Sequence, residues 1–168
     1  MHLTQSNFCR RVRDQFPGYF TGVEVLDVGS LDVNGNNRYL FNDCSYTGID
    51  IGIGPNVDVV SPVHLWKTDK TFTTIISTEC FEHDRYYIQS IAAIVKLLHK
   101  KGLFVMTCAG SGRAEHGTHK TDNSSPFTKD YYRNLTVADI MVCVGAHFER
   151  FEFDTSVPGD LYFWGIKR

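Results

Sequence analysis

Apolar residues follow two patterns along this chain. One is the spacing of a helix with one apolar face, and the other is the short continuous run of a buried strand. Residues 4–16 place three apolar side chains four positions apart, at Phe8, Val12 and Phe16. This spacing makes one face of a helix apolar. A Pro-Gly pair follows directly and ends the pattern. We therefore expect residues 1–18 to form an N-terminal helical segment.

Short apolar runs bounded by turn residues predict buried strands. The runs lie at residues 23–28, 46–51, 57–60, 73–77 and 103–108. Residues 34–41, between the first two strands, are the expected position of a short helix. The strongest helical pattern covers residues 84–99, with apolar side chains at Ile88, Ile91, Ala92, Val95 and Leu98. Gly102 is the expected C-cap of that helix.

The chain ends in a pattern typical of a hairpin. Residues 147–153 and 161–167 are predicted strands on either side of a Val-Pro-Gly-Asp turn. So short a connection allows only an antiparallel pair. Thr136 is expected to cap a further helix before it. Because strands and helices alternate over the rest of the chain, the pattern predicts an α/β protein. We expect a three-layer, Rossmann-like sandwich with a mostly parallel sheet and a C-terminal antiparallel hairpin.

Length and composition narrow the class of protein. A chain of 168 residues predicts a single domain over residues 1–168, and 42% hydrophobic residues provide an ample core. The net charge of −2 gives no overall attraction for nucleic acid and therefore disfavours it as a partner. Five widely spaced cysteines suggest neither a disulfide framework nor a zinc ribbon. With no apolar run of about 18 residues and no signal-peptide core, we expect no membrane association and a cytoplasmic monomer or homodimer.

Candidate binding residues gather where the first two strands end. Asp27 and Gly29 close the first strand, and Asp50 closes the second. A glycine at this position lets a ligand approach the backbone, and an acid at the tip of the second strand can accept hydrogen bonds from both ribose hydroxyls. The combination suits an adenosine-containing cofactor. A strand that merely ends in aspartate is the alternative.

The turn after the first strand discriminates between adenosine cofactors. A dinucleotide site needs a Gly-x-Gly-x-x-Gly turn at a helix N-terminus, where bare amides hold the pyrophosphate. Residues 27–32 read Asp-Val-Gly-Ser-Leu-Asp, with one glycine and two carboxylates that would repel phosphate. S-adenosylmethionine carries a sulfonium and an ammonium but no phosphate. The turn therefore favours S-adenosylmethionine over NAD.

Four segments, in order, resemble successive motifs of the class I S-adenosylmethionine-dependent methyltransferases. They are residues 25–35, 46–58, 77–83 and 100–110. Residues 75–83, Ile-Ile-Ser-Thr-Glu-Cys-Phe-Glu-His, are similar to the segment after the fourth strand in the small type 11 branch. The resemblance covers roughly residues 20–168. It implies a seven-stranded sheet with a reversed last strand and an S-adenosylmethionine-dependent methyltransferase activity.

The resemblance also implies roles for single residues. The implied cofactor-binding residues are Asp27, Gly29, Ser30, Asp50, Ile51 and Ser77. Asp27 and Gly29 would form the turn on the methionine side of the cofactor. Asp50 would hold the ribose, Ile51 would pack beside the adenine, and Ser77 would contact the amino group through its backbone.

Two positions depart from the family pattern. Leu31 stands where many members have a second glycine, so the turn is expected to have a different shape. Pro62 lies near the position of an acidic residue that contacts adenine in relatives, and Asp58 is a candidate substitute.

Three histidines are candidates for the chemistry. Methyl transfer needs alignment, exclusion of water and, for a protonated acceptor, a general base. His83, in the Glu82-His83 pair after the fourth strand, is one candidate, although such a pair can simply orient the next helix. His116 and His119 are the others, on a loop at residues 109–134 that we expect to form the substrate rim. With Glu115 they could hold a metal, but the spacing without a supporting helix favours a solvated loop, and no metal is assigned.

The preferred interpretation is a methyltransferase that acts on a small-molecule acceptor. Two other classes remain open. One is a non-catalytic module that binds S-adenosylmethionine or a protein partner, and the other is a nucleotide- or NAD-linked enzyme on the same sheet. The residues do not identify the acceptor atom.

Overall fold

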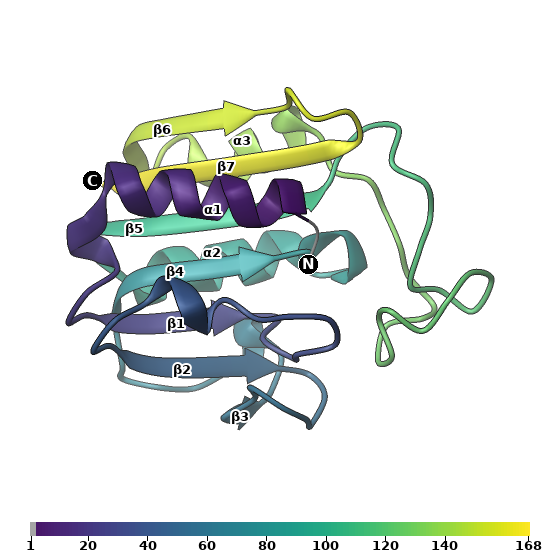
Figure 1. The fold of residues 1–168 in the computed structure, drawn as a ribbon, viewed down its shortest axis with the longest axis horizontal. Coiled ribbons are helices and arrows are strands. Elements are labelled where there is room, and N and C mark those ends of the chain that lie inside the picture. Colours follow the sequence, from purple (N-terminus) through teal and green to yellow (C-terminus); the bar gives the residue numbers. More distant parts are fainter. Residues whose placement is uncertain (1–2) are drawn as a thin grey trace.

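The expected strands pair into one sheet in the computed structural model, which describes residues 3–168 (Figure 1). The strands are β1 (Glu24–Val28), β2 (Ser45–Asp50), β3 (Val59–Val60), β4 (Phe72–Thr78), β5 (Leu98–Ala109), β6 (Phe148–Asp154) and β7 (Asp160–Lys167). Their order is β3-β2-β1-β4-β5-β7-β6. β7 is antiparallel to both β5 and β6, and the other pairs are parallel. The predicted parallel sheet with a C-terminal hairpin is confirmed.

Three α-helices cover the two faces of this sheet. They are α1 (Leu3–Gln15), α2 (Tyr87–Leu97) and α3 (Val137–Val144). Figure 1 shows α1 across β5 and β7 on one face, with α2 and α3 on the opposite face. The expected three layers are therefore present. Residues 1 and 2 of the expected N-terminal segment lie outside the described residues. None of the described helices combines the length and the apolarity needed to cross a bilayer.

Side chains of β5 alternate between the two faces and so link two apolar cores. Leu103 and Val105 pack in the core under α1, whereas Phe104 and Met106 pack in the larger core under α2 and α3. Adjacent residues of a strand point to opposite faces, and both faces of this sheet are covered. This explains why the run is apolar at every position rather than at every second one. In the core under α1, the ring of Phe8 stacks on that of Tyr162 with centroids 4.8 Å apart.

The boundary between α2 and β5 differs from the prediction. The helix begins at Tyr87 and ends at Leu97, and Gly102 lies inside β5 instead of capping the helix. Leu98 has an extended backbone and pairs with Phe72 of β4. The prediction of a Gly102 cap was therefore wrong, because strand pairing begins directly after the helix. The cap prediction for α3 is confirmed, since Thr136 forms a capping box with the third residue of the helix.

The connection between β1 and β2 contains no α-helix, and the short helix expected at residues 34–41 is limited to a single 3-10 turn. Every residue between the two strands is described, and only Arg38–Leu40 form a 3-10 helix. Asp32 accepts hydrogen bonds from the Gly35 amide at 2.7 Å and from the Asn36 side chain at 2.6 Å. Such local bonds satisfy the backbone in a turn and compete with helix formation.

Candidate cofactor and acceptor cleft

Two cavities lie at the carboxyl ends of the parallel strands. The larger has a volume of about 640 Å³ and the smaller about 420 Å³. Gly29, Leu31 and His83 line both of them, so the two cavities are neighbours that share a wall. This edge is where ligands bind in open parallel sheets. The strand order reverses between β1 and β4, which places the cleft at the topological switch point.

The turn after β1 fits tightly against the end of β4. Gly29 has a φ of 76°, and a Cβ atom on it would lie 2.5 Å from the Sγ atom of Cys80. Its amide donates a hydrogen bond to the Ile49 carbonyl at 2.9 Å. Only glycine combines this backbone conformation with so little space. The bare backbone of the turn is therefore a wall of both cavities.

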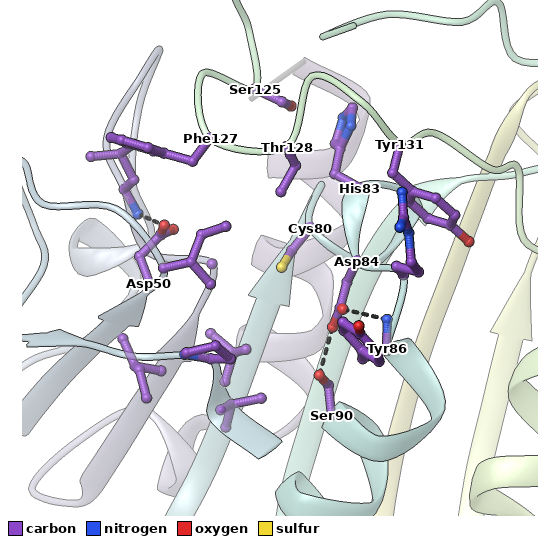
Figure 2. A pocket seen from close by; sticks show the side chains of 18 of the residues that line it. Asp50, Cys80, His83, Asp84, Tyr86, Ser90, Ser125, Phe127, Thr128 and Tyr131 are labelled. Atoms are coloured by element: carbon purple, nitrogen blue, oxygen red, sulfur yellow. Dashed lines mark hydrogen bonds between the residues drawn. The ribbon is translucent and has the colours of Figure 1, made fainter. Parts of the chain in front are cut away.

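Asp50 ends β2 on the rim of the larger cavity (Figure 2). One carboxylate oxygen accepts the Leu31 amide at 3.1 Å, and the other accepts the Gly52 amide at 3.0 Å. These two bonds fix the orientation of the carboxylate. A carboxylate has about four lone-pair sites, so each oxygen can still accept another hydrogen bond. Asp50 can thus hold two adjacent hydroxyl groups.

Asp27 lies behind the turn on the wall of the smaller cavity and is almost fully buried. Its carboxylate accepts hydrogen bonds from the Tyr46 hydroxyl at 2.5 Å and from the amides of Asn37 at 3.2 Å and Asn56 at 3.4 Å. Burial raises the pKa of Asp27 to about 6, although these bonds oppose the rise. The carboxylate is mainly ionised at neutral pH and gives the smaller cavity a negative wall.

The remaining predicted cofactor residues divide into two groups. Ile51 is 43% exposed and lines the larger cavity, and Ser30 is buried and lines the smaller one. The Ser30 hydroxyl has no hydrogen-bond partner among the described residues. Ser77 lines neither cavity, because its fully buried hydroxyl donates to the Val28 carbonyl at 2.9 Å within the sheet.

A long segment without helix or strand, residues 110–136, closes the cleft from above. Figure 2 shows it passing over the larger cavity with Ser125, Phe127 and Thr128 on its inner side. A Cβ atom on Gly52 would lie 2.0 Å from the Phe127 ring, so this segment touches the end of β2. We call residues 110–136 the rim loop. It supplies residues to both cavities, and the role of residues 109–134 as the substrate rim stays a prediction.

The three candidate histidines do not lie together. His83 is buried, and its ring centroid lies 5.1 Å from that of His116, which lines the smaller cavity. His119 is exposed and lines neither cavity. Burial, assisted by His116, lowers the pKa of His83 to about 4. The His83 imidazole is therefore neutral at neutral pH and is a weak proton acceptor.

Glu79 is a cleft residue to which the sequence analysis assigned no role. It lines both cavities, and it has a φ of 52° at the end of β4. Its carboxylate accepts the Thr107 hydroxyl at 3.1 Å and lies 3.9 Å from the Arg113 guanidinium, which also pairs with Asp160. Burial raises the pKa of Glu79. The sequence signal was an acidic residue directly after a strand, the same signal that identified Asp50.

Glu82, which was expected with His83 to face the cleft as a candidate base, lines neither cavity. It belongs to the 3-10 helix Phe81–His83 and is fully buried. One carboxylate oxygen accepts the Ala109 amide at 3.1 Å, and the other has no partner among the described residues. Burial, with the charge of Glu79 nearby, raises the pKa of Glu82 well above its usual range. The pair Glu82-His83 is visible in the sequence, but its approach to His116 is not.

The sheet order, the glycine turn and the acid at the tip of β2 define the class I S-adenosylmethionine-dependent methyltransferase fold, and the chain has this fold. Comparison with protein-family models and with curated proteins finds no match. Among solved structures, it is similar to the 1,6-didemethyltoxoflavin-N1-methyltransferase of Burkholderia thailandensis, with bound 1,6-didemethyltoxoflavin and S-adenosylhomocysteine. The TM-score is 0.67 at 17% identity, covering 97% of this chain and 78% of that one.

Two further solved structures have the same fold. Phosphoethanolamine N-methyltransferase 2 of Haemonchus contortus, in complex with S-adenosyl-L-methionine, matches with a TM-score of 0.70 at 14% identity. That match covers 96% of this chain but only 52% of the longer protein. The N-methyltransferase NodS of Bradyrhizobium japonicum, in complex with S-adenosylhomocysteine, matches with a TM-score of 0.65 at 12% identity, covering 97% and 86%. At these identities the likeness establishes the fold.

Proposed function

We propose that this protein is an S-adenosylmethionine-dependent methyltransferase that acts on a small-molecule acceptor. The observation that carries the proposal is the position of Asp50. Its carboxylate is held by two backbone amides on the rim of the larger cavity and keeps the capacity to accept two hydroxyl hydrogen bonds. The structures similar to this chain include methyltransferases bound to S-adenosylmethionine or S-adenosylhomocysteine.

The residues around Asp50 fit an adenosine. The apolar side chains of Ile49, Ile51, Pro62 and Val63 line the larger cavity. An adenine ring would find flat, apolar contacts there, with its ribose at Asp50. Asp58 does not line either cavity, so it does not serve as the acidic adenine contact. In this proposal adenine is held by packing rather than by a carboxylate.

The methionine end of the cofactor would lie towards the turn after β1. The bare backbone at Gly29 and the buried Ser30 hydroxyl provide polar contacts without occupying the space. The ionised Asp27 carboxylate favours a cationic group in its neighbourhood. A sulfonium with a nearby ammonium has this character. Ser30 lines the same cavity and its hydroxyl has no partner among the described residues, so it is a candidate contact for the cofactor.

The missing first helix argues against a dinucleotide. In dinucleotide-binding folds, the pyrophosphate rests on the N-terminus of the helix that follows the first strand. Here the described chain between β1 and β2 has only the 3-10 helix Arg38–Leu40. No row of free helical amides points at the cleft, and the buried Asp27 carboxylate would repel a phosphate. The NAD-linked alternative is disfavoured on both counts.

When bound, the cofactor supplies an electrophilic methyl group on its sulfonium. The residues of this chain would position it and exclude water. The rim loop contributes to the walls of both cavities. The smaller cavity would hold the methionine end of the cofactor beside Asp27 and Ser30, and the acceptor on its opposite side, beside Arg113 and His116. Alignment of the two reactants can remove roughly 7–11 kcal/mol from the barrier of such a reaction. All five cysteines are free thiols, which fits the proposed cytoplasmic location.

Calorimetry with S-adenosylhomocysteine tests the proposal. We expect saturable binding at one site per chain, and NADH should not compete with it in a thermal-shift assay. Absence of heat at near-millimolar ligand would contradict the cofactor assignment. A non-catalytic module would also bind S-adenosylhomocysteine. It would, however, consume no S-adenosylmethionine with any acceptor in a broad small-molecule screen.

A further inference from the structure

Three potential metal ligands converge beside the smaller cavity. Glu82, His83 and His116 each offer one ligand atom, and these atoms all lie within 4.8 Å of one another. Glu82 and His83 come from the 3-10 helix after β4, and His116 comes from the rim loop. Segments that are distant in sequence thus place two imidazoles and a carboxylate around one point.

Two of these groups are buried without a partner. Neither the second carboxylate oxygen of Glu82 nor the Nδ1 atom of His83 has a hydrogen-bond partner among the described residues. Glu82 is fully buried, and His83 is 7% exposed. An unpaired buried carboxylate oxygen is costly, since it loses its water without gaining a replacement. The nearby Glu79 carboxylate further disfavours the ionised form of Glu82. A cation at the centre of the cluster would satisfy both unpaired atoms and stabilise the Glu82 carboxylate.

We propose that Glu82, His83 and His116 bind a divalent transition-metal ion, with Zn²⁺ as the simplest case. Two imidazoles and one carboxylate form the ligand set of catalytic zinc sites, which leave a position open for water or substrate. Mg²⁺ and Ca²⁺ prefer sets made only of oxygen atoms, so the donor chemistry points away from them. The ion would be the partner that the second Glu82 carboxylate oxygen lacks, and its positive charge would stabilise the ionised carboxylate.

The surroundings orient both imidazoles. The Nδ1 atom of His116 lies 3.1 Å from the Ala114 carbonyl oxygen. A hydrogen bond from Nδ1–H to this carbonyl would leave the Nε2 atom free to bind the metal. The Tyr132 ring packs on both imidazoles, with centroids 5.4 Å from His83 and 4.9 Å from His116. Gly117 is also required, because a Cβ atom on it would lie 2.8 Å from the His83 Cε1 atom. A side chain at this position would therefore push the rim loop away from His83.

The proposed site replaces the earlier expectation of no metal and differs from the pair first considered. His119 is exposed and lines neither cavity, so the His116–His119 spacing does not form the site. His83 and His116 line the smaller cavity, so the open position of the ion would face the proposed acceptor. That role, binding an oxygen or nitrogen atom of the acceptor, rests on the proposed function. Metal binding itself does not.

Metal titration tests the site directly. The whole chain is stripped with a chelator, dialysed and titrated with Zn²⁺, and the bound metal is counted by mass spectrometry. The visible spectrum of the Co²⁺-loaded protein reports the ligand geometry. We expect one ion per chain in the wild type and an affinity at least about tenfold lower in His116→Ala. The melting temperature of His116→Ala without metal should match that of the metal-free wild type, because His116 is partly exposed.

His119→Ala is the matched control, since it removes a histidine from the same loop and should bind metal as the wild type does. Glu82→Gln should also lose affinity, and His116→Ala remains decisive if Glu82→Gln does not fold. The proposal is overturned if the wild type binds no stoichiometric Zn²⁺ or if His116→Ala binds it equally well. Equal loss in His119→Ala would also overturn it. Calorimetry with S-adenosylhomocysteine on the same samples separates failure of the metal site from failure of the methyltransferase proposal.

Discussion

Gly29 and Cys80 meet so closely that the space for one methyl group is missing between them. A Cβ atom at Gly29 would lie 2.5 Å from Sγ and 2.6 Å from Cβ of Cys80. The contact joins the turn after β1 to the end of β4, and both residues line the larger cavity. The shape of the cofactor cleft therefore depends on the absence of a side chain at one position.

Gly29→Ala should reduce both stability and the affinity for S-adenosylhomocysteine. The left-handed backbone conformation alone costs an alanine roughly 1–2 kcal/mol, and displacement of Cys80 adds to this. Gly22→Ala is the control, because Gly22 has a similar φ of 65° but nothing within 4 Å of the added atom. Urea denaturation should show a larger loss for Gly29→Ala than for Gly22→Ala. Equal losses would mean that the contact with Cys80 is easily relieved.

Asp50→Ala should weaken the binding of S-adenosylhomocysteine by about 2 kcal/mol, or roughly 30-fold, because it removes charged acceptors from two hydroxyl groups. Asp58→Ala is matched to it. Asp58 also accepts a backbone amide, that of Gly48 at 2.7 Å, but lines neither cavity. Calorimetry should give nearly wild-type affinity for Asp58→Ala. An unchanged affinity in Asp50→Ala would reject the ribose assignment.

The buried Asp27 should make stability depend on pH. Its folded-state pKa of about 6 lies above the ordinary value of 3.8, so the folded chain holds the proton more tightly than the unfolded chain. Its contribution to stability is fully present below pH 4 and is lost as the pH rises through 6. The loss amounts to about 3 kcal/mol at most. Arg38 and Tyr46 are the charged and titratable neighbours that act on it.

The measurement for Asp27 compares unfolding free energies of the wild type and Asp27→Asn between pH 4 and 8. The difference between the two proteins should change by up to about 3 kcal/mol as the pH rises, with the wild type losing stability relative to the variant. A difference that stays constant across this range would show that Asp27 has an ordinary pKa.

Phe127→Ala should reduce the affinity for S-adenosylhomocysteine several-fold while changing stability little. Phe127 is 51% exposed, lines the larger cavity and rests on Gly52. If the bound ligand covers the exposed half of the Phe127 side chain, this burial contributes roughly 1 kcal/mol to the binding free energy. Gly52→Ala should act in the same direction by pushing the ring away. Tyr39→Ala, at a residue with 44% exposure outside both cavities, is the control and should bind normally.

Much of the fold could be predicted because apolar periodicity decides buried elements. The five parallel strands and the hairpin are bounded by turn residues, and the core under each helix follows from spacing. The end of α2 could not be placed, since Leu98 continues into a strand only because Phe72 pairs with it. The short helix expected after β1 is limited to one 3-10 turn. The side chain of Asp32 bonds to Gly35 and Asn36, and this local preference outweighs the helical pattern.

The candidate site was predictable where it depends on strand ends. Asp27, Gly29 and Asp50 reach the cleft because parallel strands finish at one edge. The positions of His116 and His119 could not be separated from sequence, since they depend on the path of an irregular loop. The same holds for the buried Glu82, whose unpaired oxygen follows from the tertiary packing around it.

The missing helix after β1 restricts what this cleft can become. A site for a diphosphate needs several parallel amide groups at a helix end, and such a row cannot be created by exchanging side chains. Conversion to a nicotinamide-dependent enzyme would require an insertion long enough to build at least two helical turns between Gly29 and Ser45, together with removal of the buried acid. Random point mutation of this scaffold should therefore change acceptor preference long before it changes the cofactor.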